Sequence, residues 1–258
     1  KLLSKMDAAC AELEKRTQER AAREQAEYER KLAARKERGG TGPAPKPPSA
    51  EPKADEQVNL TDADARLMRK NKREGYTQSY NAQAVVDADE GSQRIVGQRV
   101  STSPSDSNQL EADLAVVPAS LGPVAAVLAD CGYAKKEVIQ RFEEDDQLPE
   151  LYVSVHREDA HSEREYDYRP PKRRLQPKEP KDPILIAMGD KLRTDEGKAL
   201  YRKRGASVET VFGTIKGALG FRQFLLRGQE KVSGEWSLVC LAYNVKRLFN
   251  LKQIAQQG

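Results

Sequence analysis

Histidine and cysteine are scarce in this chain of 258 residues, which contains two histidines and three cysteines. Cys10, Cys131 and Cys240 are widely spaced and form no CxxC pair, so the sequence indicates neither a zinc site nor a disulfide framework. His156 and His161 are too few for a histidine-rich metal site. No apolar run approaches the ~20 residues of a membrane helix, and no signal peptide is visible. These absences favour a protein of the reducing cytoplasm with no membrane partner.

Charge is abundant instead, and it divides the chain into segments. Charged residues make up 33% of the sequence, which is too many for a single compact core throughout. Residues 1–38 are rich in Ala, Glu, Lys and Arg and contain no Gly or Pro, which predicts a charged helical segment. Residues 39–58 begin with "GGTGPAPKPPSAEP" and are predicted to be a Pro/Gly-rich linker. The rest, residues 59–258, is expected to form the main domain.

Hydrophobic patterns after the linker predict a mixed α/β domain. The runs Tyr80–Ala88 and Gln93–Ser103, separated by "DEGS", predict an antiparallel hairpin. A helix over Asn108–Val117, capped near Ser107, is expected next. Further along, the sequence predicts a buried strand at Val124–Asp130, a helix at Lys135–Glu144, a short strand at Glu150–Val155 and a basic loop at Arg157–Pro183. Three helices are expected after the loop, at Ile184–Arg204, Ser207–Ala218 and Ser233–Gln256. This order resembles a ribonuclease H-like mixed sheet flanked by helices, without its first strand.

Two basic clusters favour a polyphosphate partner. One lies in the predicted loop and includes Lys172, Arg173 and Arg174; the other surrounds the late helices and includes Arg204, Lys216, Arg222 and Arg227. Clustered positive charge suits phosphates better than an even scatter does. The alternative for either cluster is an ordinary solvated surface.

Two carboxylates are candidates for chemistry. Asp130 ends an apolar strand in "LADCGY", and functional groups gather beyond the carboxyl ends of strands in open α/β sheets. Glu209 lies on a helix, in "SVETVFGTIK", whose apolar residues Val208, Phe212 and Ile215 are expected to pack inward. Carboxylates without histidine suit Mg²⁺ or Mn²⁺. The alternatives are a helix-cap or turn aspartate at 130 and a salt-bridge partner at 209.

Several longer segments resemble the DDE transposases of bacterial insertion sequences, in the group with a Tyr-Arg-Glu-Lys signature. The resemblance runs from about Asn59 to the C-terminus and includes "NLTDADARLM", "GYTQSYNAQAVVDAD", "LADCGY" and "LRTDEGKALYRKRGASVETVFGTIKGALGFRQFLLRGQEKVSGEWSLVCLAYNVKRL". It implies that Asp130 and Glu209 are catalytic and bind metal. It also implies that Tyr201, Arg204 and Lys216 complete the signature, although the gap between Arg204 and Glu209 is one residue longer than usual.

The first catalytic aspartate of the family has no counterpart here. It normally lies on the first strand, whereas Asp62 and Asp64 belong to a later motif and Asp87 falls on another strand. The resemblance therefore implies an N-terminally truncated, C-terminal portion of a transposase.

The function implied is metal-dependent DNA strand cleavage and transfer at insertion-sequence ends. The resemblance also implies two Mg²⁺ or Mn²⁺ ions in the intact enzyme, double-stranded DNA as partner, a homo-oligomer on DNA, and a nucleoid-associated place in the bacterial cytoplasm. The alternative is a catalytically inactive remnant that binds transposon ends or pairs with intact transposase. Weak metal affinity is expected because one ligand is absent.

Overall fold

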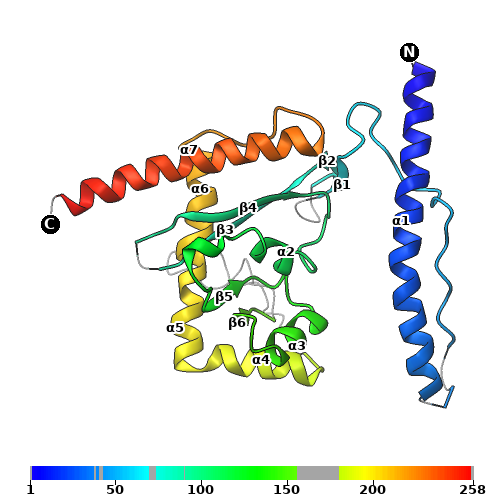
Figure 1. Cartoon of the computed structure of the whole chain (residues 1–258), viewed down its shortest axis with the longest axis horizontal. Coiled ribbons are helices and arrows are strands. Elements are labelled where there is room, and N and C mark those ends of the chain that lie inside the picture. Colours follow the sequence, from blue (N-terminus) through cyan, green and yellow to red (C-terminus); the bar gives the residue numbers. More distant parts are fainter. Residues whose placement is uncertain are drawn as a thin grey trace, which may run out of the picture. The chain divides into compact units, whose positions relative to one another are not determined.

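The chain folds into two compact units, Lys1–Tyr80 with Arg227–Gln229, and Asn81–Leu226 with Glu230–Gly258. The structure is a computed structural model that describes residues 2–37, 39–40, 43–69, 74–89, 91–155 and 180–256 (Figure 1). The predicted basic loop with Lys172, Arg173 and Arg174, together with His156 and His161, lies outside the described residues.

The first unit is built on a single long helix, α1 (Leu2–Glu37). Arg20 Nη1 donates to both carboxylate oxygens of Glu56, at 2.8 and 2.9 Å, and Arg16 Nη2 donates to the carbonyl oxygen of Ala63. These contacts hold the segment that follows the Pro-rich stretch along the helix. Two short antiparallel strands, β1 (Arg66–Met68) and β2 (Thr77–Ser79), complete the unit and were not predicted from the sequence.

The second unit begins with the predicted hairpin, which is confirmed. β3 (Asn81–Val86) pairs antiparallel with β4 (Ile95–Ser101), and the register shifts at a bulge between Val85 and Val86. Gln93 in the connection has φ 48°, the left-handed conformation common in tight turns.

A parallel strand pair forms the second sheet of this unit. β5 (Ala126–Ala129) pairs with β6 (Glu150–Val153), and α3 (Lys136–Glu144) connects them as a crossover helix. α3 buries Ile139 and Phe142 against the pair, where the core also contains Leu110, Ala129, Leu151, Val153 and Met188. The mixed α/β class is therefore confirmed. Within the described residues, no backbone ladder joins β3–β4 to β5–β6.

The observed helices and strands correct three predictions. α2 covers only Leu110–Leu114 and begins at Gln109 without a side-chain cap, so the expected cap near Ser107 is wrong; a short 3-10 turn, η1 (Ala119–Leu121), follows. The helix expected over 184–204 is two helices, α4 (Pro183–Arg193) and α5 (Asp195–Arg204). They separate at Thr194, whose Oγ1 accepts from the amide of Gly197 at 3.0 Å and so caps the new helix. The strand predicted at 124–130 is shorter and mostly half-buried.

The last helix, α7 (Gln229–Ala255), packs one side onto the hairpin and begins four residues earlier than expected. Trp236 is 2% exposed, as predicted for a core residue, and its indole nitrogen donates to the carbonyl oxygen of Gln83 at 2.9 Å. The hydroxyl of Tyr243 donates to the carbonyl oxygen of Gln93. The side-chain amide of Asn244 accepts from the backbone amide of Ile95 and donates to the carbonyl oxygen of the same residue. None of the described helices is long and apolar enough to span a membrane.

Candidate active site at the end of β5

Asp130 lies in a tight turn directly after β5. Its Oδ1 accepts from the amide of Gly132 at 2.7 Å, its carbonyl oxygen accepts from the amide of Tyr133 at 3.1 Å, and its side chain is exposed. α3 begins six residues later with Lys135 at its cap, so Asp130 is not a helix cap. Asp130 is therefore a turn aspartate through Oδ1, as one of the alternatives predicted, and its exposed carboxylate remains accessible to a ligand.

Tyr201 connects the late helices to this turn. Its hydroxyl donates to the carbonyl oxygen of Ala129, the residue before Asp130, at 3.2 Å. Tyr201 lies on α5, and the guanidinium carbon of Arg204, one turn further on, is 5.5 Å from the centroid of the tyrosine ring. The tyrosine and arginine of the signature therefore lie together beside the end of β5.

A π-helical turn, η2 (Gly205–Glu209), separates Arg204 from the rest of the helix. Around the axis of an α-helix, two side chains four positions apart differ in direction by about 40°, and two side chains five positions apart by about 140°. A π turn, whose hydrogen bonds link residues five positions apart, brings two such side chains closer to the same direction. Arg204 Nη2 is accordingly 3.5 Å from Glu209 Oε1, although five positions separate the two residues. The π turn therefore lets Arg204 and Glu209 pair across an interval of five residues.

Glu209 and Lys216 are both exposed, whereas the opposite side of the helix is buried. α6 (Thr210–Gly217) continues from η2, and the buried residues of this stretch are Ser207, Val211 and Ile215. The predicted inward packing is confirmed for Ile215, which is buried, and for Phe212, which is half-buried and stacks on the buried Trp236 at a centroid separation of 5.9 Å. Val208 is half-buried.

The remaining basic residues of the signature region are also on the surface. Lys216 Nζ lies 5.5 Å from the ring centroid of Phe212, and Arg222 Nε donates to the carbonyl oxygen of Lys216 at 3.3 Å. Arg222 and Arg227 are exposed, and Arg227 belongs to the first unit.

The other aspartates considered from the sequence have hydrogen-bond partners within their own units. Asp62 Oδ1 accepts from the amide of Gly228 at 3.2 Å and Asp64 Oδ2 from the amide of Gln229 at 2.9 Å, so both stabilise backbone at the start of α7. Burial raises the pKa of Asp87, but hydrogen bonds from Ser92, a backbone amide and Arg94 outweigh it and hold that pKa below its ordinary value. Asp87 therefore fastens the hairpin turn.

Sequence reasoning missed one carboxylate beside Asp130. Asp106 Oδ1 accepts from the side-chain amides of Asn81 and Gln83, each at 2.7 Å. A methyl group on Gly132 would lie 2.8 Å from Asp130 Oδ1 and 3.4 Å from Asp106 Oδ2, so the two carboxylates converge on the open face of this glycine. The only sequence signal is an aspartate in "STSPSDSNQL", where Ser and Pro indicate a turn and nothing more.

The carboxylates of this region are ligands of the type that a hard divalent cation prefers, but too few of them lie together to bind one. Asp130, Glu209 and Asp106 offer oxygen ligands, the type that Mg²⁺ and Mn²⁺ prefer. Across the described ranges, however, no three His, Cys, Asp or Glu side chains are grouped closely enough to hold a metal ion. The described residues therefore do not constitute a complete metal centre.

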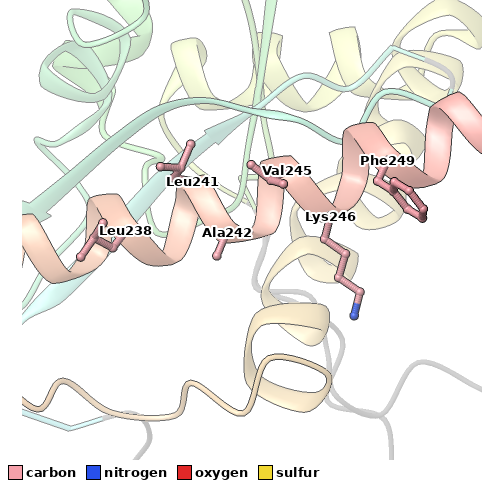
Figure 2. Close-up of a pocket in the computed structure, with 6 residues that line it drawn as sticks. All are labelled: Leu238, Leu241, Ala242, Val245, Lys246 and Phe249. Carbon is pink, nitrogen blue, oxygen red and sulfur yellow. The ribbon is translucent and has the colours of Figure 1, made fainter.

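A shallow groove lies elsewhere, on the exposed side of α7. Figure 2 shows the side chains that line it, all from that helix: Leu238, Leu241, Ala242, Val245, Lys246 and Phe249. It is apolar apart from one lysine, so its chemistry differs from that of the carboxylate site.

Comparison with known proteins identifies the family to which the chain belongs. The family model for the transposase DDE domain matches residues 45–245. The match covers most of the chain, and the chain therefore belongs to this family. No curated protein and no solved structure matched it.

Proposed function

We propose that this chain is the C-terminal catalytic part of a bacterial insertion-sequence transposase, which cleaves and transfers DNA strands at the ends of the element. The observation that supports this most strongly is the hydrogen bond from Tyr201 to Ala129. It joins α5, which bears Arg204, to the residue before Asp130, and Arg204 in turn pairs with Glu209.

In this proposal each residue has a distinct role. Asp130 and Glu209 would hold Mg²⁺ or Mn²⁺ together with a further ligand from outside the described residues. A pair of such ions would supply charge stabilisation for the attacking and leaving oxygens. Arg204 orients the carboxylate of Glu209, and Lys216 holds a neighbouring phosphate as a compact point charge.

We further propose that the sheet is ribonuclease H-like and needs one more strand, bearing the third carboxylate. The support is the division of the second unit into two separate two-stranded sheets, β3–β4 and β5–β6. A strand inserted between two such pairs would satisfy edge groups on both sides. It would also complete the ligand set that the described residues lack.

The second candidate function is an inactive remnant that binds transposon ends or pairs with an intact transposase. The same shortage of ligands favours it. The deciding experiment compares Mg²⁺-dependent nicking of an end-containing duplex by this chain and by the full reading frame that contains it. Cleavage by the full frame alone supports a catalytic portion that needs its missing strand. Binding without cleavage by both supports the remnant.

DNA binding in either case is proposed to use basic residues of the predicted loop and of the connection between α6 and α7: Lys172, Arg173, Arg174, Arg222 and Arg227. Contacts of this kind are mainly to phosphates, so each contact removed should lower the slope of log affinity against log salt by about 0.9. Charge-neutralising changes at 172–174 should lower both the affinity and the slope. If both values stay unchanged, the loop is not part of the interface.

We also propose that the chain forms a homo-oligomer on DNA through α7. Leu238, Leu241, Val245 and Leu248 are all exposed and recur at intervals of three and four residues, the spacing of a coiled-coil seam. Such a stripe can pack against the same stripe of a second copy. Leu241→Lys should abolish a dimer seen by light scattering, whereas Lys246→Gln should not. A dimer that survives Leu241→Lys places the contact elsewhere.

A further inference from the structure

A chain of hydrogen-bonded polar side chains, the relay, connects the turn that contains Asp130 to the β3–β4 hairpin. The hydroxyl of Tyr133 donates to Oε1 of Gln83 at 2.6 Å, and Nε2 of Gln83 donates to Oδ1 of Asp106 at 2.7 Å. Asn81 donates to the same oxygen of Asp106 at 2.7 Å. The relay therefore runs from the residue that closes the Asp130 turn to two residues of β3.

Each donor and acceptor in the relay has a defined direction. An ionised aspartate only accepts, a glutamine amide can both donate and accept, and a phenol that remains protonated can donate. Burial raises the pKa of Tyr133, and the charges of nearby aspartates raise it further, so its hydroxyl remains a donor at neutral pH. Gln83 is 7% exposed, and a buried amide is costly to leave unpaired.

The relay spans a place where the backbone provides no connection. β3 and β5 belong to separate sheets in the described part of the chain, so no ladder sets the position of the Asp130 turn relative to the hairpin. Asp106 also lies against Gly132, whose amide binds Asp130 Oδ1, and only a glycine leaves room for both carboxylates.

We infer that Asp106 is a positioning residue for Asp130, acting through Gln83 and Tyr133. It fixes the Asp130–Tyr133 turn on β3 and so holds the Asp130 carboxylate in one orientation at the end of β5. The catalytic meaning of this arrangement rests on the transposase function proposed above, but the positioning itself does not.

The test uses hydrogen exchange of the Gly132 amide, followed by NMR in this chain. Asp106→Ala should speed exchange at Gly132 by about tenfold, because the turn is released. Asp106→Asn should restore slow exchange, since its side-chain oxygen still accepts from both amides. Tyr133→Phe should give a smaller acceleration at the same amide. The matched control is Asp146→Ala, an exposed aspartate of the same unit, which should change nothing.

Strand cleavage by the full reading frame gives a second measurement. Asp106→Ala should lower kcat with DNA affinity unchanged, and Asp106→Asn should recover most of it. Unchanged Gly132 exchange in Asp106→Ala would overturn the inference. So would an Asp106→Asn variant as impaired as Asp106→Ala, because the charge would then act directly. A wild-type frame that does not cleave overturns the proposed function alone, since the exchange result stands independently.

Discussion

Glu209→Gln separates a catalytic glutamate from a structural one. The substitution keeps the size of the side chain and removes only its charge. Glu209 is 65% exposed, whereas the side chain of Arg204, 3.5 Å away, is 11% exposed, so water screens only the carboxylate end of the ion pair. A long pair with one screened partner contributes about 0–1 kcal/mol to the free energy of unfolding. For a chain of this size that is a fall in Tm of roughly 3 °C at most.

The effect on chemistry should be far larger. In the full reading frame that contains this chain, Glu209→Gln should lower Mg²⁺-dependent strand cleavage by about 100- to 1,000-fold or more, the order that loss of one charge-stabilising group costs an enzyme. DNA affinity should change little, because Glu209 contributes no positive charge. Lys216→Ala should instead weaken DNA binding and reduce cleavage less completely.

The assay pairs calorimetric Tm with nicking of a labelled duplex that carries a transposon end. Glu196→Gln, an exposed carboxylate on α5, is the matched control and should be silent in both measurements. Normal cleavage with Gln at 209 would refute the catalytic assignment and leave Glu209 as a salt-bridge residue. A fall in Tm well beyond 3 °C would refute the argument from exposure.

Three further outcomes are expected. Trp236→Phe should lower the free energy of unfolding, measured in urea, by about 2–4 kcal/mol, because it opens a cavity and leaves the buried carbonyl of Gln83 without its donor. A decrease below about 1 kcal/mol would mean that another group donates to this carbonyl. The pKa of Asp87 is lowered in the folded chain, so its contribution is present above the ordinary aspartate pKa and is lost as the pH falls through the folded value. The Tm difference between wild type and Asp87→Asn should therefore be present at pH 6 and shrink as the pH falls below the ordinary aspartate pKa of about 4, and a constant difference would contradict this. Deletion of Ala206, which is exposed in the π turn, should leave Tm and cleavage intact, whereas deletion of Thr214 should unfold α6 because it rotates the buried face by about 100°.

Much of the second unit could be predicted because its signals are local. The β-branched runs around "DEGS" specify the hairpin, and an apolar run followed by an amphipathic helix specifies the β5–α3–β6 crossover. The break at Thr194 was missed because the residues on both sides favour helix. Only the cap formed by the threonine side chain reveals it.

The candidate site was predicted less completely, for a physical reason. Asp130 and Glu209 carry signals in their own neighbourhoods, a strand end and a helix. Asp106 is defined only by partners on β3, more than twenty residues away in sequence, so nothing near it distinguishes it from other turn aspartates. Strands β1 and β2 were missed because three residues are too few to show a period.

The π turn also bears on how this part of the chain tolerates a change of length. Because the turn lets Arg204 and Glu209 pair across five positions, a residue gained or lost within it should change the local winding of the helix and leave the carboxylate in place. Changes of length should therefore be tolerated between residues 204 and 209, ahead of the buried face of α6.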